Sequence, residues 1–187
     1  VRARYTDGKP YFLYVGALQP RKNIDTLLRA FDRFKAAHDH PAQLLIVGRK
    51  AWKYDAIIQA YDAMRHRADV RFTGYVQDGE LADLYSGALA LCYVSHYEGF
   101  GLPLLEAMHC DTPLLAAQAA SLPEVAGQAA LYVAPTDETA ITEAMTRLAF
   151  EPDLRRQLVA AGRTQRLRFS WDATAESVWA ALAGVIR

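Results

Sequence analysis

The sequence predicts an α/β fold in which six parallel strands form one doubly wound sheet, followed by a helical extension at the C-terminus. Three observations lead to this fold class. Short, continuous apolar runs recur along the chain, as in strands buried on both faces of a parallel sheet. Segments with helical periodicity separate these runs, because parallel neighbours need long crossover connections. After residue 133 only helical patterns follow.

The apolar runs are the predicted strands, and the first of them is rich in the aromatic residues that sheets favour. They cover residues 11–15, 43–48, 70–76, 89–95, 113–117 and 129–133. The predicted helices cover residues 24–38, 54–67, 79–86, a segment beginning at Pro103, a turn at 123–126, and then 137–150, 152–166 and 170–185. Asn23 and Asp137 are expected to cap the two helices that they precede. Together these elements predict one Rossmann-like domain with a helical tail.

This domain is expected to span residues 11–187. Residues 1–10 are polar and end at Lys9-Pro10, so we expect them to be the remnant of a linker. The first residues, Val1 to Arg4, resemble neither a signal peptide nor a natural start. We therefore expect the chain to be one part of a longer protein.

Length and composition suit a single core and give the chain no overall charge. The chain has 187 residues, of which 52% are hydrophobic and 22% charged, enough to bury one sizeable core. Its 21 basic and 21 acidic residues cancel, so no overall field attracts nucleic acid or an anionic membrane. Cys92 and Cys110 are too few to cross-link the fold and predict thiols in a reducing compartment. No apolar run reaches membrane-spanning length, and we expect a cytoplasmic location.

The most informative stretch covers residues 89–108 and is typical of a strand, a glycine loop and the start of a helix. Gly99 and Gly101 permit unusual backbone angles and let a ligand approach the free amides of the first helical turn. Such amides, together with the helix dipole, bind anions. Glu98 and Glu106 frame this loop, and carboxylates suit the hydroxyls of a sugar better than a phosphate. The stretch therefore indicates a ligand with both phosphate and sugar.

Glu106 has two interpretations. The helix dipole alone favours an acid in a first turn. Its neighbours Leu104, Leu105, Ala107 and Met108 predict, however, a poorly solvated carboxylate that needs hydrogen-bond donors. Ribose hydroxyls would supply them.

Basic residues follow the first two predicted strands, and so share one rim with the glycine loop at the carboxyl edge of a parallel sheet. Arg21 could bind a pyrophosphate in bidentate fashion, and Lys22 as a point charge. Arg49, Lys50 and Lys53 follow the second strand. For these three residues we favour the simpler interpretation of solvated surface cations.

Residues 98–108, EGFGLPLLEAM, resemble the E-x7-E signature of retaining glycosyltransferases of family four, which have the GT-B fold. Four further segments are similar to family features. They are Gly16 with PRKN at 20–23, FTGYV at 72–76, SLPEVAG at 121–127, and FSW at 169–171. The resemblance covers nearly the whole chain and identifies it as similar to the donor-binding C-terminal domain. One departure is at residues 117–120, AQAA, where relatives carry small polar residues, so phosphate contacts from those side chains are not expected.

The resemblance implies a role for each site residue. The second glutamate of the signature, Glu106, would hold the ribose of the donor nucleotide. The first, Glu98, would lie beside the transferred sugar and its leaving phosphate, with Arg21 and Lys22 on the pyrophosphate, and these three form the expected catalytic group. The other expected donor-binding residues are Gly16, beside the phosphate, Tyr75 and Val76, at the base, and Gly99, Phe100, Gly101 and Leu102, through their amides.

No metal or cofactor is expected. The five histidines lack acid or cysteine partners at metal-ligand spacing. They are His38, His40, His66, His96 and His109. The family resemblance likewise implies no required metal, because protein groups neutralise the diphosphate. Serine nucleophile elbows and Walker-type loops are absent from the sequence.

The expected function is therefore the nucleotide-sugar-binding half of a retaining glycosyltransferase. The motif wording is similar to bacterial mannosyltransferases of O-antigen or exopolysaccharide synthesis, which favours GDP-mannose over UDP-sugars as donor. Its partners would be the nucleotide sugar and an N-terminal domain with the acceptor, through which the protein could associate with the inner face of the cytoplasmic membrane. The fragment alone is expected to bind donor weakly and to transfer nothing.

Two alternatives stay open at this point. An epimerase or phosphorylase could have the same architecture, although the pyridoxal-lysine motif of a glycogen-type phosphorylase is not found. A nucleotide-binding module without its own catalysis is the other. A preceding α/β domain in the full-length protein would argue against it.

Overall fold

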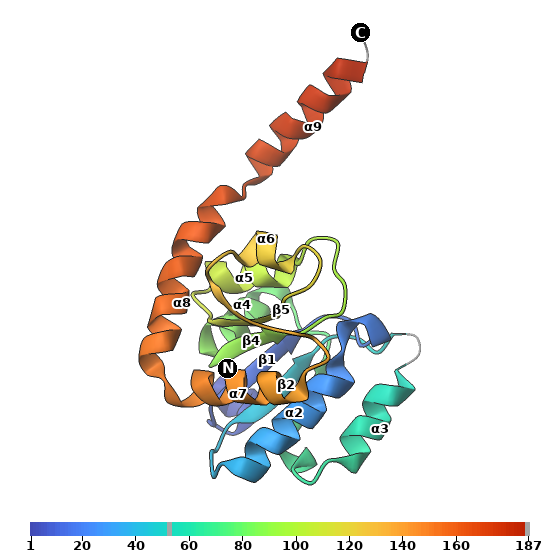
Figure 1. The fold of residues 1–187 in the computed structure, drawn as a ribbon, viewed down its shortest axis with the longest axis vertical. Helices are drawn as coiled ribbons and strands as arrows, with labels where there is room; N and C mark the ends of the chain where they lie inside the picture. Colours follow the sequence, from blue (N-terminus) through green and yellow to red (C-terminus); the bar gives the residue numbers. More distant parts are fainter. Residues whose placement is uncertain (52–53, 186–187) are drawn as a thin grey trace.

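The computed structural model describes residues 1–51 and 54–185. Its six strands form one sheet in the order β3-β2-β1-β4-β5-β6, and every neighbouring pair is parallel (Figure 1). The strands are β1 (Tyr11–Val15), β2 (Gln43–Val47), β3 (Val70–Gly74), β4 (Ala90–Tyr93), β5 (Leu114–Ala117) and β6 (Ala130–Val133). The predicted doubly wound sheet is confirmed.

Strands β1 and β4 lie at the centre of the sheet, and the connections that follow them diverge there. In β1 the side chains from Tyr11 to Tyr14 are completely buried, because both faces of the strand are covered. Leu13 pairs with Leu45 of β2 on one side and with Leu91 of β4 on the other. A change of winding direction at such a pair opens a crevice beyond the carboxyl ends of the strands. The fold thus marks the β1–β4 junction as the place for a ligand.

Helices cover both faces of the sheet. The regular helices are α1 (Arg2–Thr6), α2 (Ile24–Ala37), α3 (Asp55–Ala63), α4 (Asp78–Gly87), α5 (Leu102–His109), α6 (Leu122–Ala126), α7 (Glu138–Phe150), α8 (Pro152–Gln165) and α9 (Trp171–Val185). Helix α2 packs between α3 and α7, whereas α5 contacts α4, α6 and α8 (Figure 1). The predicted cap of α7 is confirmed, since the Asp137 carboxylate accepts a 2.9 Å hydrogen bond from the Ala140 amide.

Helix α3 is shorter than the prediction for residues 54–67. It ends at Ala63, and Met64 is extended. The Asp32 carboxylate of α2 accepts hydrogen bonds from the amides of Arg65 and His66, at 3.3 and 2.8 Å. This distant side chain satisfies amides that a longer helix would have bonded to its own carbonyls, so a tertiary contact overrides the local periodicity.

Residues 1–10, predicted as a linker remnant, contain the short helix α1 packed against β2 and β3. Thr6 is buried, and its hydroxyl donates to the carbonyls of Arg2 and Lys9. The Arg2 guanidinium donates to the carbonyl of Gly87 at the end of α4. These residues therefore form part of the packed domain surface and are not a linker. Their polar composition does not reveal this packing.

Helix α9 is the predicted C-terminal extension and projects away from the rest of the fold (Figure 1). Its side chains from Trp171 to Gly184 are all exposed, with Trp171 at 82% and Trp179 at 73%. None of the helices within residues 1–51 and 54–185 combines the length and the apolar character that crossing a membrane requires.

Candidate donor-binding site

The loops after β1 and β2 are joined at the carboxyl edge of the sheet. The amide of Leu18 donates to the carbonyl of Arg49 at 2.9 Å, and Leu18 pairs with Lys50 as an isolated parallel bridge. A Cβ atom on Gly48 would lie 1.9 Å from the carbonyl oxygen of Gly16, so the approach of the two loops requires a glycine there. Gly16 has a φ of 149° and borders the Tyr14 hydroxyl. Packing and backbone conformation therefore explain why residue 16 is a glycine. The predicted contact of Gly16 with phosphate stays a prediction.

Arg21 and Lys22, the two cations predicted to bind pyrophosphate, lie on the turn Pro20–Lys22, directly before α2. Asn23 follows in a left-handed conformation, with a φ of 58°. Its side chain does not cap α2, contrary to the prediction. The Asn23 amide group instead donates to the carbonyls of Val94, at 2.9 Å, and Pro135, at 2.6 Å. This buried amide fixes the cationic turn against the end of β4 and the loop after β6.

Glu98 connects the glycine loop to both cations. Its Oε1 atom lies 2.6 Å from Lys22 Nζ, and its Oε2 atom lies 2.7 Å from Arg21 Nη1. Glu98 and Lys22 are only 6% and 7% exposed, whereas Arg21 is exposed. Burial by itself would raise the pKa of Glu98, but the hydrogen bonds from Lys22 and Arg21 outweigh it and hold that pKa below its ordinary value. The structure thus brings the three predicted catalytic residues together as one ionised cluster.

Tyr93 also belongs to this cluster, although no sequence pattern singles it out. Its hydroxyl accepts a 2.8 Å hydrogen bond from Lys22 Nζ, and its ring stacks near Tyr14 with centroids 6.4 Å apart. Burial lowers the pKa of Lys22, and the contact with Glu98 opposes that shift. The Tyr93 hydroxyl therefore supplies part of the solvation that the buried ammonium has lost.

Replacing Tyr93 by phenylalanine is expected to lower the free energy of unfolding by about 1.5 kcal/mol, because a hydrogen bond to a buried charge is lost. Urea denaturation measures this loss. Tyr14→Phe is a matched control, since it removes a buried hydroxyl that donates to the uncharged Ala17 carbonyl, at 3.3 Å, and should cost about 0.5 kcal/mol. Equal losses in the two variants would show that Tyr93 does not stabilise the charge of Lys22.

The glycine loop ends at Gly101, which is the N-cap of α5 and has a φ of 104°. A Cβ atom there would lie 2.8 Å from Leu122, whereas a Cβ on Gly99 would meet nothing within 4 Å. Phe100 and Leu102 are exposed side chains of the same loop. Within the described part of the chain, the amides of residues 99–102 have no hydrogen-bond acceptor. The predicted anion seat thus has free donors at a helix N-terminus, and anion binding there stays a prediction.

Glu106 differs from its predicted environment. The side chain is exposed rather than poorly solvated, and it already accepts a 2.7 Å hydrogen bond from the Tyr85 hydroxyl. Burial raises the pKa of Tyr85 well above its ordinary value, and the adjacent Glu106 carboxylate raises it further. Exposure arises because Glu106 lies on the outer side of α5, while Leu104 and Ala107 face the core. Its ribose contact stays a prediction.

Tyr75 and Val76 lie at the end of β3, where the base is predicted to bind. Tyr75 is 61% exposed, and the Arg49 guanidinium lies over its ring at 4.6 Å from the centroid. Val76 is buried, so only its backbone could meet a ligand. Lys50 is exposed and lies 5.4 Å from the centroid of Tyr54. Arg49 and Lys50 are thus surface cations that also contact aromatic rings, and Lys53 lies outside the described residues.

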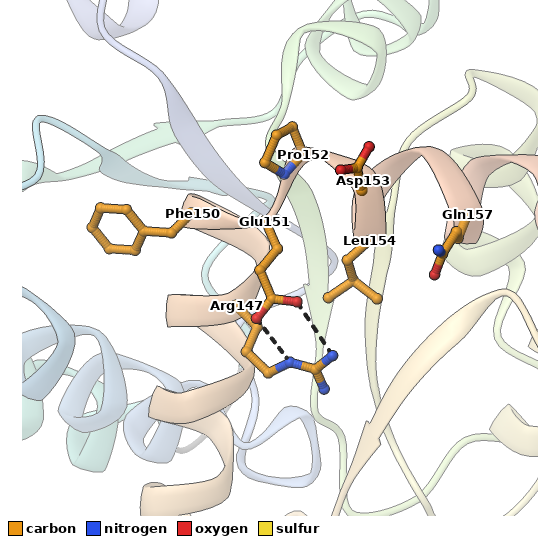
Figure 2. A pocket seen from close by; sticks show the side chains of 7 residues that line it. All are labelled: Arg147, Phe150, Glu151, Pro152, Asp153, Leu154 and Gln157. Atoms are coloured by element: carbon orange, nitrogen blue, oxygen red, sulfur yellow. Dashed lines mark hydrogen bonds and ion pairs between the residues drawn. The ribbon is translucent and has the colours of Figure 1, made fainter.

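A surface pocket elsewhere does not compete with this rim. It lies where α7 ends and α8 begins, and Figure 2 shows the side chains of Arg147 and Glu151, two of its lining residues, joined to each other by hydrogen bonds. Its lining residues are Arg147, Phe150, Glu151, Pro152, Asp153, Leu154 and Gln157. None of them is a predicted site residue. Helix α7 starts beyond the carboxyl end of β6 and runs back along the sheet. The pocket at its end therefore lies near the amino ends of the strands, away from the rim.

Within residues 1–51 and 54–185, no group of three or more histidine, cysteine or acidic side chains could hold a metal ion. His96, the histidine nearest the glycine loop in sequence, is exposed. Cys92 is a buried thiol and Cys110 is half-buried. The expectation that no metal is needed remains a prediction about the complete reaction.

The six-stranded parallel sheet and the rim at its carboxyl edge can be compared with known proteins. The family model described as "Glycosyl transferases group 1" matches residues 3–165, so the chain belongs to this family and the resemblance seen in its motifs is confirmed. It is 37% identical to the O-antigen chain mannosyltransferase B of Escherichia coli over 162 residues, which are 87% of this chain and 42% of that protein. It is 35% identical to the O-antigen chain mannosyltransferase RfbU of Salmonella typhimurium over 143 residues, or 76% of this chain and 39% of that protein.

A solved structure shares the architecture. The sucrose-phosphate synthase of Thermosynechococcus elongatus superposes with a TM-score of 0.85 and 29% identity, covering 99% of this chain and 48% of that one. The chain spans less than half the length of these relatives.

Proposed function

We propose that this chain is the nucleotide-sugar-binding half of a retaining hexosyltransferase that moves mannose from GDP-mannose to a glycan or lipid-linked acceptor. One observation carries the proposal. The buried Lys22–Glu98 pair and Arg21 lie beside the free amides of the glycine loop, at the crevice where open α/β sheets bind ligands.

The charges of this cluster suit a diphosphate. Two cations and one carboxylate leave one net positive charge, which by itself does not neutralise a nucleoside diphosphate. The amides of residues 99–102 and the N-terminus of α5 supply the additional stabilisation. When the bond from the sugar to the diphosphate breaks, negative charge grows on the leaving phosphate, and donors already fixed in place stabilise it without reorganising. This division of work is proposed to need no metal.

Each predicted residue then has a position in the complex. Arg21 and Lys22 bind the diphosphate, Glu98 orients them and lies beside the transferred sugar, and Glu106 accepts from the ribose. Glu106 can do so because its carboxylate is exposed and has acceptor sites beyond the one used by Tyr85. The base lies against Tyr75 and the backbone of Val76.

The names of the relatives support mannose as the sugar, because both curated bacterial relatives described above are O-antigen mannosyltransferases. GDP-mannose is the corresponding donor. A UDP-sugar is the alternative, since few contacts at Tyr75 and Val76 would read the base. The acceptor site is proposed to lie in a preceding domain of a longer protein at the inner face of the cytoplasmic membrane, and a module that binds nucleotide without catalysis is the remaining alternative.

Titration calorimetry of the chain with GDP, UDP, GDP-mannose and UDP-glucose tests the donor site. Arg21→Ala and Glu106→Ala are each expected to weaken binding by at least about tenfold, or 1.4 kcal/mol. The matched controls are Arg156→Ala and Glu143→Ala, which remove exposed charges on α8 and α7. Controls that weaken binding equally would contradict a site at this rim.

Two further conditions separate the alternatives. Equal affinity in EDTA and in magnesium is expected if protein groups alone neutralise the diphosphate. Tighter binding of GDP than of UDP would identify guanine as the base of the donor. Transfer of mannose by the full-length protein, and none by this chain alone, would distinguish an enzyme from a binding module.

A further inference from the structure

Ser121 holds the glycine loop from the side opposite to the cations. Its Oγ atom lies 3.0 Å from the carbonyl oxygen of Glu98 and 2.9 Å from that of Phe100. A hydroxyl has one hydrogen to donate, so the two carbonyls share it and both must stay on the Ser121 side of the loop.

This contact determines where two amides point. In a planar trans peptide the N–H is directed opposite to the C=O of the same peptide group. The carbonyl of Glu98 shares its peptide with the amide of Gly99, and the carbonyl of Phe100 shares its peptide with that of Gly101. Both amides are therefore directed away from Ser121, and in the described part of the chain neither has an acceptor.

The strand order gives that direction a meaning. The glycine loop follows β4, which lies between β1 and β5 in the sheet. Ser121 follows β5, whereas Arg21 and Lys22 follow β1. Amides that point away from the β5 loop thus point towards the side of the two cations. The two amides and the two cations are therefore directed to the same side of the glycine loop.

The loop that carries Ser121 is held in a specific and costly shape. Its first residue, Gln118, is tied to the sheet by a 2.8 Å hydrogen bond from its amide to the Val133 carbonyl. Ala120 has a φ of 48°, a left-handed conformation that is strained for a residue with a Cβ. Such strain persists only where the surrounding structure requires it. Here it brings the Ser121 hydroxyl to the carbonyls of the glycine loop.

We propose that Ser121 is a positioning residue for the donor diphosphate: by keeping the carbonyls of Glu98 and Phe100 on the β5 side, it aims the amides of Gly99 and Gly101 at the phosphate between them and the cations. This inference rests on the proposed function for the identity of the anion. Residues 117–120 lack the small polar side chains that relatives carry there. In this proposal the loop after β5 acts instead through the Ser121 hydroxyl, which bonds the backbone of the glycine loop.

Ser121→Ala and Ser121→Thr test the role, with Ser86→Ala as the control for loss of a hydroxyl that bonds a carbonyl elsewhere, on α4. In Ser121→Ala, GDP or UDP is expected to bind about tenfold more weakly, with little change in melting temperature. Ser121→Thr keeps the hydroxyl and should restore binding, and Ser86→Ala should bind as the unaltered chain does. Unchanged binding by Ser121→Ala would overturn the proposal.

Amide spectra of the chain without nucleotide give a second readout. The ¹H–¹⁵N resonances of Gly99 and Gly101 are expected to move in Ser121→Ala and to stay in place in Ser121→Thr and Ser86→Ala. If the unaltered chain binds neither GDP nor UDP, the proposed function loses its support, and these spectra decide the role of Ser121. Unmoved glycine resonances in Ser121→Ala would then refute it.

Discussion

Replacing Glu98 by glutamine is expected to lower the free energy of unfolding by about 3 kcal/mol, because breaking a buried ion pair leaves an uncompensated charge. Lys22 is only 7% exposed, and its ammonium would keep Tyr93 but lose its carboxylate. Urea denaturation of the purified chain measures the loss. Glu151→Gln is a suitable control, since it breaks an exposed pair with Arg147 that is worth at most about 0.5 kcal/mol.

A double variant identifies the cause of the loss. Lys22→Met removes the buried ammonium, so Lys22→Met combined with Glu98→Gln should be more stable than Glu98→Gln alone. If the double variant is no more stable than the single one, the unpaired charge of Lys22 is not the reason for the destabilisation.

The same pair predicts an acid-dependent contribution to stability. The folded pKa of Glu98 lies below its ordinary value of 4.5. Between these two values the unfolded chain takes up a proton that the folded chain does not, so the contribution is present above about pH 4.5 and is lost as the pH falls through the folded pKa. The stability difference between the unaltered chain and Glu98→Gln should therefore shrink on acidification. A constant difference from pH 7 to pH 3 would argue against the ion pair.

Alanine at Gly101 is expected to destabilise the fold by about 2–3 kcal/mol, combining left-handed strain with a clash. The φ of 104° disfavours any residue with a Cβ, and that Cβ would lie 2.8 Å from Leu122. Thermal and urea denaturation would record the loss before any ligand is added.

Gly99→Ala is the informative counterpart, two residues away. A Cβ at Gly99 meets nothing within 4 Å, so the free energy of unfolding should change by less than about 1 kcal/mol. Binding of GDP or UDP should nevertheless fall by at least about tenfold, because the methyl group would occupy the space of a phosphate at the free amides. Gly99→Ala that binds nucleotide normally would place the diphosphate elsewhere.

Much of the site follows from local sequence. The run EGFGLPLLEAM at 98–108 places two glycines before a helix start and two carboxylates around it, and the structure has that loop and that helix. The apolar runs predict all six strands within one or two residues of their ends. These features depend on periodicity, turn residues and strand-end position, which neighbouring residues determine.

The contacts within the site depend instead on residues far apart in the chain. Glu98 meets Lys22 across 76 positions, and Ser121 reaches back 23 positions to Glu98. Asn23 looks like a helix cap in sequence, yet the carbonyls of Val94 and Pro135 bind its side chain. No local pattern encodes these partners, because they become neighbours only when β1, β4 and β5 pair in the sheet.

Sequence patterns establish the class of fold, the order of its elements and the types of residue available at one rim. Their surroundings become visible only in the folded chain, where Glu98 is buried between two cations, Glu106 is exposed beside Tyr85, and Ser121 bonds the carbonyls of the glycine loop. The physical reason is that secondary structure is favoured by local periodicity, whereas burial and hydrogen-bond direction are set by whichever distant element packs against a residue.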